Sequence, residues 1–238
     1  MSSNYKTSSF SKVNNLSFDV GLRSYMQRVY AFMSMALFLT AAVSFFASQS
    51  TELMRTIHFT PLRWLVMFAP LGFVIFFGVK INSMSSNAAK NCLWGFSALM
   101  GLSLSYIFLA YTGISIIRIF LISACMFGAT SFYGYVTKKD LTSFGSFLIM
   151  GLIGIIIASI VNIFMQSSAL EFAISVIGVF VFLGLSAYDT QRAKNMYYQV
   201  ASADSATIQK SAIMNALSLY MDFINLFLML LMLFGERR

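Results

Sequence analysis

The 238-residue chain is 58% hydrophobic and only 10% charged, and its net charge is +8. A soluble domain of this size could not cover so much apolar surface with polar groups, so lipid must be the solvent for most of the chain. A large soluble domain is therefore excluded. The single histidine, His58, and two distant cysteines, Cys92 and Cys125, also exclude a histidine-rich metal site and a disulfide framework.

The chain begins with a polar region and continues with apolar stretches. Residues 1–24 lack the apolar core of a signal peptide, and we expect them to form a cytoplasmic N-terminal tail. Residues 25–238 are expected to form the transmembrane domain. It contains seven apolar stretches, near 29–48, 62–79, 92–111, 114–136, 144–165, 169–189 and 212–234. Each is long enough to cross about 30 Å of hydrocarbon as an α-helix.

The fold class follows from these stretches. Strand-like alternation is absent from the sequence, and open sheets cannot exist in lipid. We therefore predict an all-α polytopic membrane protein, a seven-transmembrane-helix bundle. Pro70, followed by Gly72, predicts a kink or an interruption in the second helix.

The basic residues predict the orientation in the membrane. With the N-terminus inside, eleven of the 16 lysines and arginines fall on the cytoplasmic side and five on the other. The last stretch then carries the C-terminus outside if it crosses fully, and a re-entrant final helix is the alternative. Because the basic residues flank apolar runs, we expect no nucleic-acid partner.

Two acidic residues lie within apolar stretches. Six of the eight lie in loops, tails or span ends, which leaves Asp189 near the end of the sixth stretch and Asp222 inside the seventh. An ionised aspartate at mid-helix costs about 2.5–3.5 kcal/mol on insertion scales, so each needs a hydrogen bond, a shared proton, a cation or water. Intramembrane ionisable groups usually mark ion or proton paths. A structural clamp between helices is the alternative.

Further polar residues accompany both aspartates. In the seventh stretch a polar stripe lies on one helical face, formed by Asn215, Ser218, Asp222 and Asn225. Ser186 shares a face with Asp189 in the sixth. Such stripes suit close, polar packing inside a bundle.

Basic residues accompany the pair at one membrane face. Arg192 follows Asp189, and Lys80 ends the second stretch on the same side, so both are candidate basic latches for the ionised pair. Asp222 lies about 10 Å deeper than Asp189 if both helices are upright, and only tilt would close that gap.

The residues around the aspartates resemble the paired signatures of the Bax inhibitor-1 (transmembrane Bax inhibitor motif) family, in its bacterial form. The specific segments are Tyr188–Gln191 and Leu217–Phe227. Weaker similarity to bacterial members lies at Gly101–Ser105, Tyr133–Tyr135 and Lys138–Leu141. Together the resemblance runs from Tyr25 to Gly235.

This resemblance implies that the last helix is central in the bundle and that the protein is a pH-sensitive calcium leak. It assigns Asp189 and Asp222 as pH sensor and ion path. Family members often pair one aspartate with an arginine at the end of the second helix, where this chain has Lys80. The bacterial form of the sequence implies the cytoplasmic (inner) membrane, and some bacterial relatives are linked to restraint of a membrane protease.

The functional hypothesis is therefore a calcium leak channel in which protonation of the pair controls a cytoplasmic-side constriction. No cofactor and no stably bound metal are expected. Calcium, the permeating ion, would be held only transiently at Asp189 and Asp222. Ca²⁺ prefers six to eight oxygens, and the sequence offers only these two carboxylates with Asn and Ser oxygens. The expected partners are the lipid bilayer, calcium, protons and a candidate membrane-protein partner.

Two alternatives stay open, and enzymes are disfavoured. The chain could be a non-conducting regulator that binds and restrains a partner such as a membrane protease, or a proton-coupled cation antiporter. An intramembrane aspartyl protease needs a Gly-x-Gly-Asp motif, whereas Leu219–Asp222 reads Leu-Tyr-Met-Asp. We therefore expect no enzymatic activity.

Overall fold

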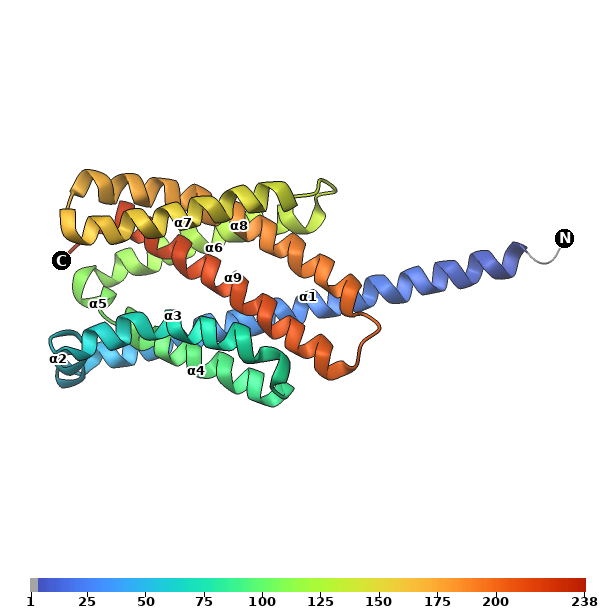
Figure 1. The fold of residues 1–238 in the computed structure, drawn as a ribbon, viewed down its shortest axis with the longest axis horizontal. Helices are drawn as coiled ribbons and strands as arrows, with labels where there is room; N and C mark the ends of the chain where they lie inside the picture. The colour runs from blue at the N-terminus through green and yellow to red at the C-terminus, as the bar shows by residue number, and fades with distance from the viewer. Residues whose placement is uncertain (1–3) are drawn as a thin grey trace.

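The computed structural model describes residues 4–238, and it describes side chains for residues 20–238 apart from those of His58 and Asn82. This part of the chain is almost entirely helical (Figure 1). In chain order the elements are α1 (Asn4–Gln49), α2 (Thr51–His58), α3 (Leu62–Lys80), η1 (Ile81–Ser83), α4 (Ser86–Leu104), α5 (Ile107–Ala110), α6 (Gly113–Val136), α7 (Thr142–Met165), α8 (Ser168–Val200) and α9 (Ser205–Phe234).

Seven helical segments are long and apolar enough to cross a membrane. They are Val20–Gln49, Leu62–Lys80, Ser86–Ala110, Gly113–Val136, Thr142–Met165, Ser168–Val200 and Ser205–Phe234. The predicted all-α, seven-span fold class is confirmed. Several helices extend beyond the apolar stretches, because a helix continues through polar residues that a hydropathy pattern excludes. Thus α8 continues past Asp189 to Val200, and α9 already begins at Ser205.

Three local features add detail to the sequence-based expectations. From Asn4 onward, the polar region expected as a tail belongs to α1, whereas residues 1–3 lie outside the described part of the chain. The helix α3 continues through Pro70, so this proline does not interrupt it. The third apolar stretch, by contrast, is divided between α4 and the short α5.

Short polar side chains define where several helices begin. A side-chain oxygen of the residue before the helix accepts a hydrogen bond from the first turn of α2, α4, α6, α8 and α9. These capping residues are Ser50, Ser85, Thr112, Ser167 and Asp204. Such caps satisfy backbone N–H groups that have no partner within the helix, so the turns between spans can be short.

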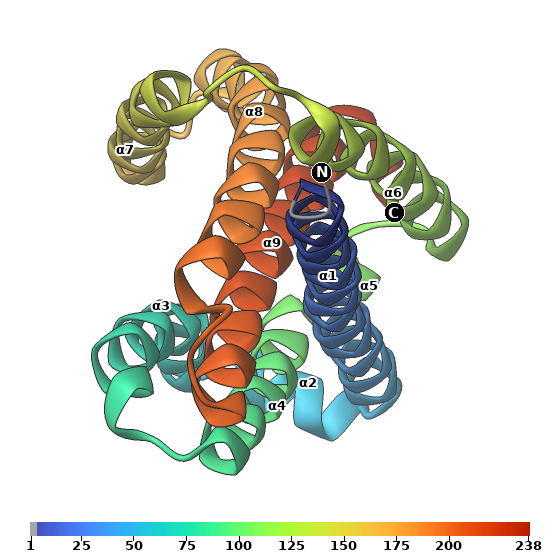
Figure 2. The ribbon, with the colours of Figure 1, turned by 90° about the vertical axis from the view of Figure 1, so that its right-hand side faces the viewer.

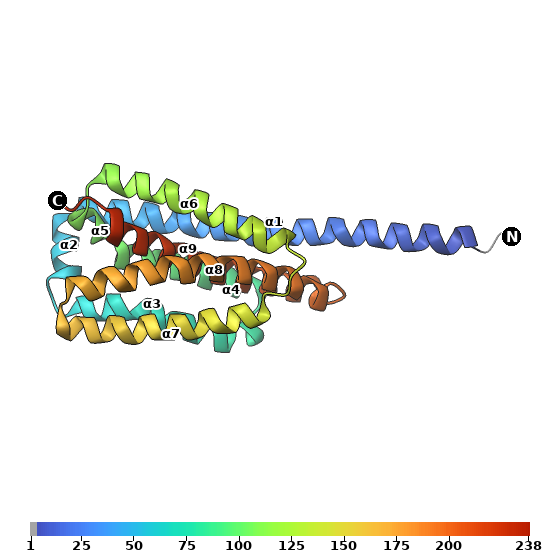
Figure 3. The ribbon, with the colours of Figure 1, turned by 90° about the horizontal axis from the view of Figure 1, so that it is seen from above.

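The bundle has two ends, which we name by the chain itself. The N side, where α1 enters, carries the links 81–85, 137–141 and 201–204, and the C side carries the links 50–61, 111–112 and 166–167 with the C-terminus (Figures 1 and 3). On the C side, Tyr111 and Arg237 form an antiparallel bridge, and Thr112 N–H donates to the Glu236 carbonyl at 3.0 Å. The chain therefore starts and ends at opposite ends of the bundle, so α9 runs its full length.

The last helix is the centre of the bundle (Figure 2). It packs against α1, α4, α6 and α8, while α3 packs mainly on α4 and α7 mainly on α8. Within its 18-residue apolar stretch, α9 buries 56% of the residues, whereas α3 and α7 each bury 11% of theirs. The predicted central position of the last helix is confirmed, and α3 and α7 are peripheral.

Candidate functional site

The two intramembrane aspartates lie on the most extensively packed pair of helices. Asp189 is on α8 and Asp222 is on α9, and their carboxyl groups lie next to each other at one cavity. The offset expected for upright helices is closed because α9 runs obliquely through the bundle (Figure 1). Chain order alone could not provide this contact.

The two carboxyls have different surroundings. Asp222 is 6% exposed, and its Oδ2 atom has no hydrogen-bond partner among the described residues. Asp189 is partly accessible, and its Oδ1 lies 3.8 Å from Nη1 of Arg192, one helical turn away. Because the Arg192 side chain is 55% exposed, this ion pair contributes little to stability.

A cavity of about 260 Å³ lies beside the pair. Its four polar lining residues come from α8 and α9, namely Asp189, Ser218, Asp222 and Asn225. The apolar part of its wall includes Val74 of α3, Leu152 of α7 and Phe182 of α8. The site thus lies between the two peripheral helices and the central pair, with carboxylate, hydroxyl and amide oxygens on one wall.

The remaining members of the polar stripes point elsewhere. The Asn215 amide donates to Tyr25 Oη at 2.8 Å and to the Ser211 carbonyl at 3.1 Å, which ties α9 to α1. The Ser186 hydroxyl lies 2.6 Å from that of Thr130 on α6. Both residues join helices and do not line the cavity.

The two candidate latches differ in position. Arg192 contacts Asp189, as described above. Lys80 is exposed at the end of α3 and forms no ion pair with any carboxylate in the described part of the chain. A latching role for Lys80 stays a prediction.

A hydrogen-bonded network that the sequence did not predict lies where α8 packs against α6. The Ser131 hydroxyl lies 2.7 Å from those of both Tyr30 and Thr190, and Thr190 donates to the Ser186 carbonyl at 2.7 Å. Two adjacent hydroxyl residues in a largely apolar stretch, Thr130 and Ser131, were the available signal.

Residues just after Asp189 hold the link between α6 and α7. Gln191 donates to the Lys139 carbonyl and accepts from Leu141 N–H, both at 2.8 Å. The Lys194 ammonium donates to the Tyr135 carbonyl at 2.9 Å. The segment that carries Asp189 is therefore fixed on its α6 side.

Two further acids lie in the links outside the spans and act as local caps. Hydrogen bonds from the Thr142 side chain and backbone lower the pKa of Asp140 below its usual value. Hydrogen bonds from Thr207 and from the first turn of α9 likewise lower the pKa of Asp204. Both carboxylates stabilise helix starts, which separates them from the intramembrane pair.

The donor set at the pair suits weak cation binding. Among the residues whose side chains are described, no three of His, Cys, Asp and Glu come together. A Ca²⁺ ion there would depend on the pair itself and on the neutral oxygens of Ser218 and Asn225, and it would reach the lower end of its preferred six to eight oxygens only if both carboxylates bound through both oxygens.

Comparison with known proteins identifies the family. The family model described as inhibitor of apoptosis-promoting Bax1 matches residues 22–238. The inner membrane protein YbhL of Escherichia coli K12 is 47% identical over 92% of this chain and 94% of that protein. An uncharacterized protein of Rickettsia prowazekii is 48% identical over 94% of both chains. An uncharacterized membrane protein of Streptococcus pyogenes is 34% identical over 92% of this chain and 95% of that protein. The chain is thus a multi-pass membrane protein that belongs to the Bax inhibitor-1 family.

Proposed function

We propose that this protein is a pH-sensitive calcium leak channel, gated by protonation of the Asp189–Asp222 pair. The observation that carries the proposal is the buried Asp222 carboxyl, which has one oxygen without a partner, touches a second carboxyl and faces a cavity. Two carboxylates in a region of low dielectric constant repel each other strongly, so such a pair either shares a proton or attracts a cation.

The gating step is proposed at the N side of the pair. Arg192 lies one turn closer to that side than Asp189, and it faces the more accessible carboxyl. A proton on Asp189 would remove the charge that holds Arg192 and would allow the N-side constriction to widen. We therefore expect calcium flux to increase as the pH falls.

An apolar barrier lies in the other direction. Beyond Asn225, α9 buries large side chains that are at most 4% exposed, namely Leu226, Phe227, Leu230 and Leu231. An ion at the pair would meet this barrier on its way to the C side, so conduction requires α9 to move relative to its neighbours. Such a barrier would keep the rate of ion passage low, as we expect of a leak.

The proposed location is the inner membrane, as for the relative YbhL, with the N-terminus in the cytoplasm. The links 81–85, 137–141 and 201–204 share the N side, and most basic residues lie in or near these links or in the N-terminal region. An excess of lysine and arginine marks the cytoplasmic side.

The test is ion flux into proteoliposomes that contain a dye selective for the ion under test, measured from about pH 5 to pH 8 with Ca²⁺, Na⁺ and K⁺ in separate runs. We expect Ca²⁺ flux that depends on pH in the wild type. Asp189→Asn and Asp222→Asn should each abolish or shift that pH dependence. The matched control is Glu52→Gln, an exposed acid on the C side that should leave the profile unchanged.

The remaining outcomes separate the alternatives. A pH profile that is unchanged in both aspartate variants would refute gating by the pair. A strict requirement for a counter-ion would assign a proton-coupled cation antiporter. Absence of flux at every pH, with folded protein in the vesicles, would favour the non-conducting regulator of a membrane-protein partner.

A further inference from the structure

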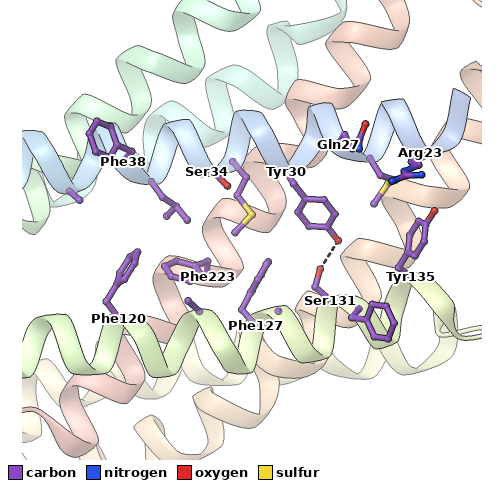
Figure 4. Close-up of a pocket in the computed structure, with 17 residues that line it drawn as sticks. Arg23, Gln27, Tyr30, Ser34, Phe38, Phe120, Phe127, Ser131, Tyr135 and Phe223 are labelled. Atoms are coloured by element: carbon purple, nitrogen blue, oxygen red, sulfur yellow. Dashed lines mark hydrogen bonds between the residues drawn. The ribbon is translucent and has the colours of Figure 1, made fainter. Parts of the chain in front are cut away.

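A second cavity, with no lining residue in common with the one at the aspartate pair, lies between α1 and α6. It has a volume of about 910 Å³. The two helices both pack on α9, but α1 otherwise packs mainly on α4, and α6 mainly on α8. The space between them is therefore a groove with walls from α1 and α6 and a floor that includes Phe223 of α9 (Figure 4).

The deep part of this groove is apolar and aromatic. The rings of Phe120 and Phe127 contact the Phe223 ring, with centroid distances of 5.3 and 5.6 Å. At the rim Phe38 is 76% exposed, so the groove continues onto the surface that faces lipid. A groove of this size and lining disfavours water and matches the dimensions of a hydrocarbon chain.

The mouth of the groove is cationic and polar. Arg23, Gln27 and Tyr135 lie at the N-side end, opposite Phe38 and Phe120 (Figure 4). Arg23 is exposed and forms no ion pair with a described carboxylate. The Lys194 ammonium adds a second positive charge, 5.5 Å from the centre of the Tyr135 ring. Arginine and lysine at the membrane surface favour anionic headgroups.

The length of the groove fits one leaflet. From Arg23 to Phe38 the helix α1 rises about 22 Å at 1.5 Å per residue. The hydrocarbon core is about 30 Å thick, so one leaflet accounts for about 15 Å of this length. The remaining length is roughly the depth of a headgroup region. One hydrogen bond crosses the groove, between Tyr30 Oη and Ser131 Oγ at 2.7 Å (Figure 4), and this bond keeps the two walls in register.

We propose that this groove is a binding site for an anionic phospholipid of the N-side leaflet. Its phosphate lies at Arg23, with Lys194 nearby, and one acyl chain extends along Phe127 and Phe120. This site is independent of the proposed channel function, because the groove shares no lining residue with the cavity at the aspartate pair.

Gly128 provides a direct way to fill the groove. It lines the cavity, and a Cβ atom built there meets nothing within 4 Å, so Gly128→Phe places a ring in the groove without a clash at its base. The matched control is Gly154→Phe on α7, where a Cβ also meets nothing within 4 Å.

The experiment uses the full chain in phosphatidylcholine nanodiscs that contain a small fraction of phosphatidylglycerol with a photoactivatable acyl chain. Mass spectrometry of the labelled peptides is expected to place the crosslinks on α1 and α6. Gly128→Phe should reduce this labelling at least fivefold, and Gly154→Phe should leave it unchanged. Unlabelled phosphatidylglycerol should compete, and added phosphatidylcholine should not.

A second variant tests the headgroup without affecting the packed interior. Arg23→Gln should reduce the preference for phosphatidylglycerol over phosphatidylcholine several-fold, while labelling of the groove by a phosphatidylcholine probe persists. Equal labelling of the α7 face and the groove, equal competition by the two lipids, or an unchanged preference in Arg23→Gln would each overturn the proposal.

Discussion

The polar side chains of α8 that face α6 and those that face the cavity at the aspartate pair differ in their hydrogen bonding. Toward α6, the hydroxyls of Ser131, Ser186 and Thr190 are all at most 3% exposed, and each has a hydrogen-bond partner. Toward the cavity, Asp189 meets Asp222, and the Oδ2 atom of Asp222 has no partner among the described residues. One helix thus carries a satisfied network on one face and an unsatisfied acid pair on the other.

This difference separates a structural interface from a site that can change state. A fully paired network in a region of low dielectric constant favours one arrangement, because any displacement leaves a buried polar group without a partner. A buried acid without a hydrogen-bond partner does not favour one arrangement, since a proton, a cation or a movement of the helix can lower its free energy. We therefore expect substitutions on the α6 face to change stability and substitutions at the pair to change function.

The largest effect on stability is expected at Gly134, where the backbone of α6 lies against the backbone of α8. A Cβ atom on Gly134 would collide with the Ala187 carbonyl, which is backbone and cannot rotate away. Gly134→Val should lower the free energy of unfolding by about 3 kcal/mol, measured by denaturation in mixed micelles. Gly154→Val on α7 is the control, because the space there is open. Equal losses in the two variants would show that the α6 face is not the rigid one.

A smaller effect is expected at Thr190, whose hydroxyl joins two members of the network. Thr190→Val keeps the shape but removes the bonds to Ser131 and to the Ser186 carbonyl. The expected loss is about 1 kcal/mol, as for other buried hydrogen bonds in membrane helices. The same denaturation assay measures it, with Thr56→Val on the exposed surface of α2 as control. A variant as stable as the control would mean that the paired network adds nothing to the α6 interface.

The smallest effect is expected outside both faces, at the cap of α9. The pKa of Asp204 is lowered by its hydrogen bonds, so its contribution to stability is present above the pKa of the unfolded chain and is lost as the pH falls through the lower, folded value. Asp204→Ala should lower the melting temperature slightly at pH 7, and the difference should narrow below about pH 4. Asp204→Asn, which keeps a capping oxygen, should melt close to the wild type at pH 7. A difference for Asp204→Ala that does not vary with pH would refute the assignment.

Much of this architecture could be predicted from the sequence, because the length of an apolar stretch determines whether it can cross a bilayer. Asp189 and Asp222 could be selected for the same reason, since carboxyl groups in apolar helices are rare and costly. Their direct contact could not be predicted. It depends on the oblique path of α9, which is set by packing against four helices at once.

The sequence also could not predict that members of the polar stripe face different helices. Spacing places residues on one face of their own helix, but a 30-residue helix passes different neighbours along its length. Asn215 therefore meets Tyr25 of α1, while Asn225 lines the cavity near α3 and α7. The groove between α1 and α6 was missed because no pattern within either helix indicates the distance between them.

The central position of α9 has a consequence for biogenesis. In chain order α9 follows the other six spans, so during synthesis α1, α4, α6 and α8 enter the bilayer before the helix on which they pack exists. Helices first insert and then associate, and here association must await the final span. A nascent chain without α9 would therefore leave exposed the faces of α1, α4, α6 and α8 that pack on it in the finished protein.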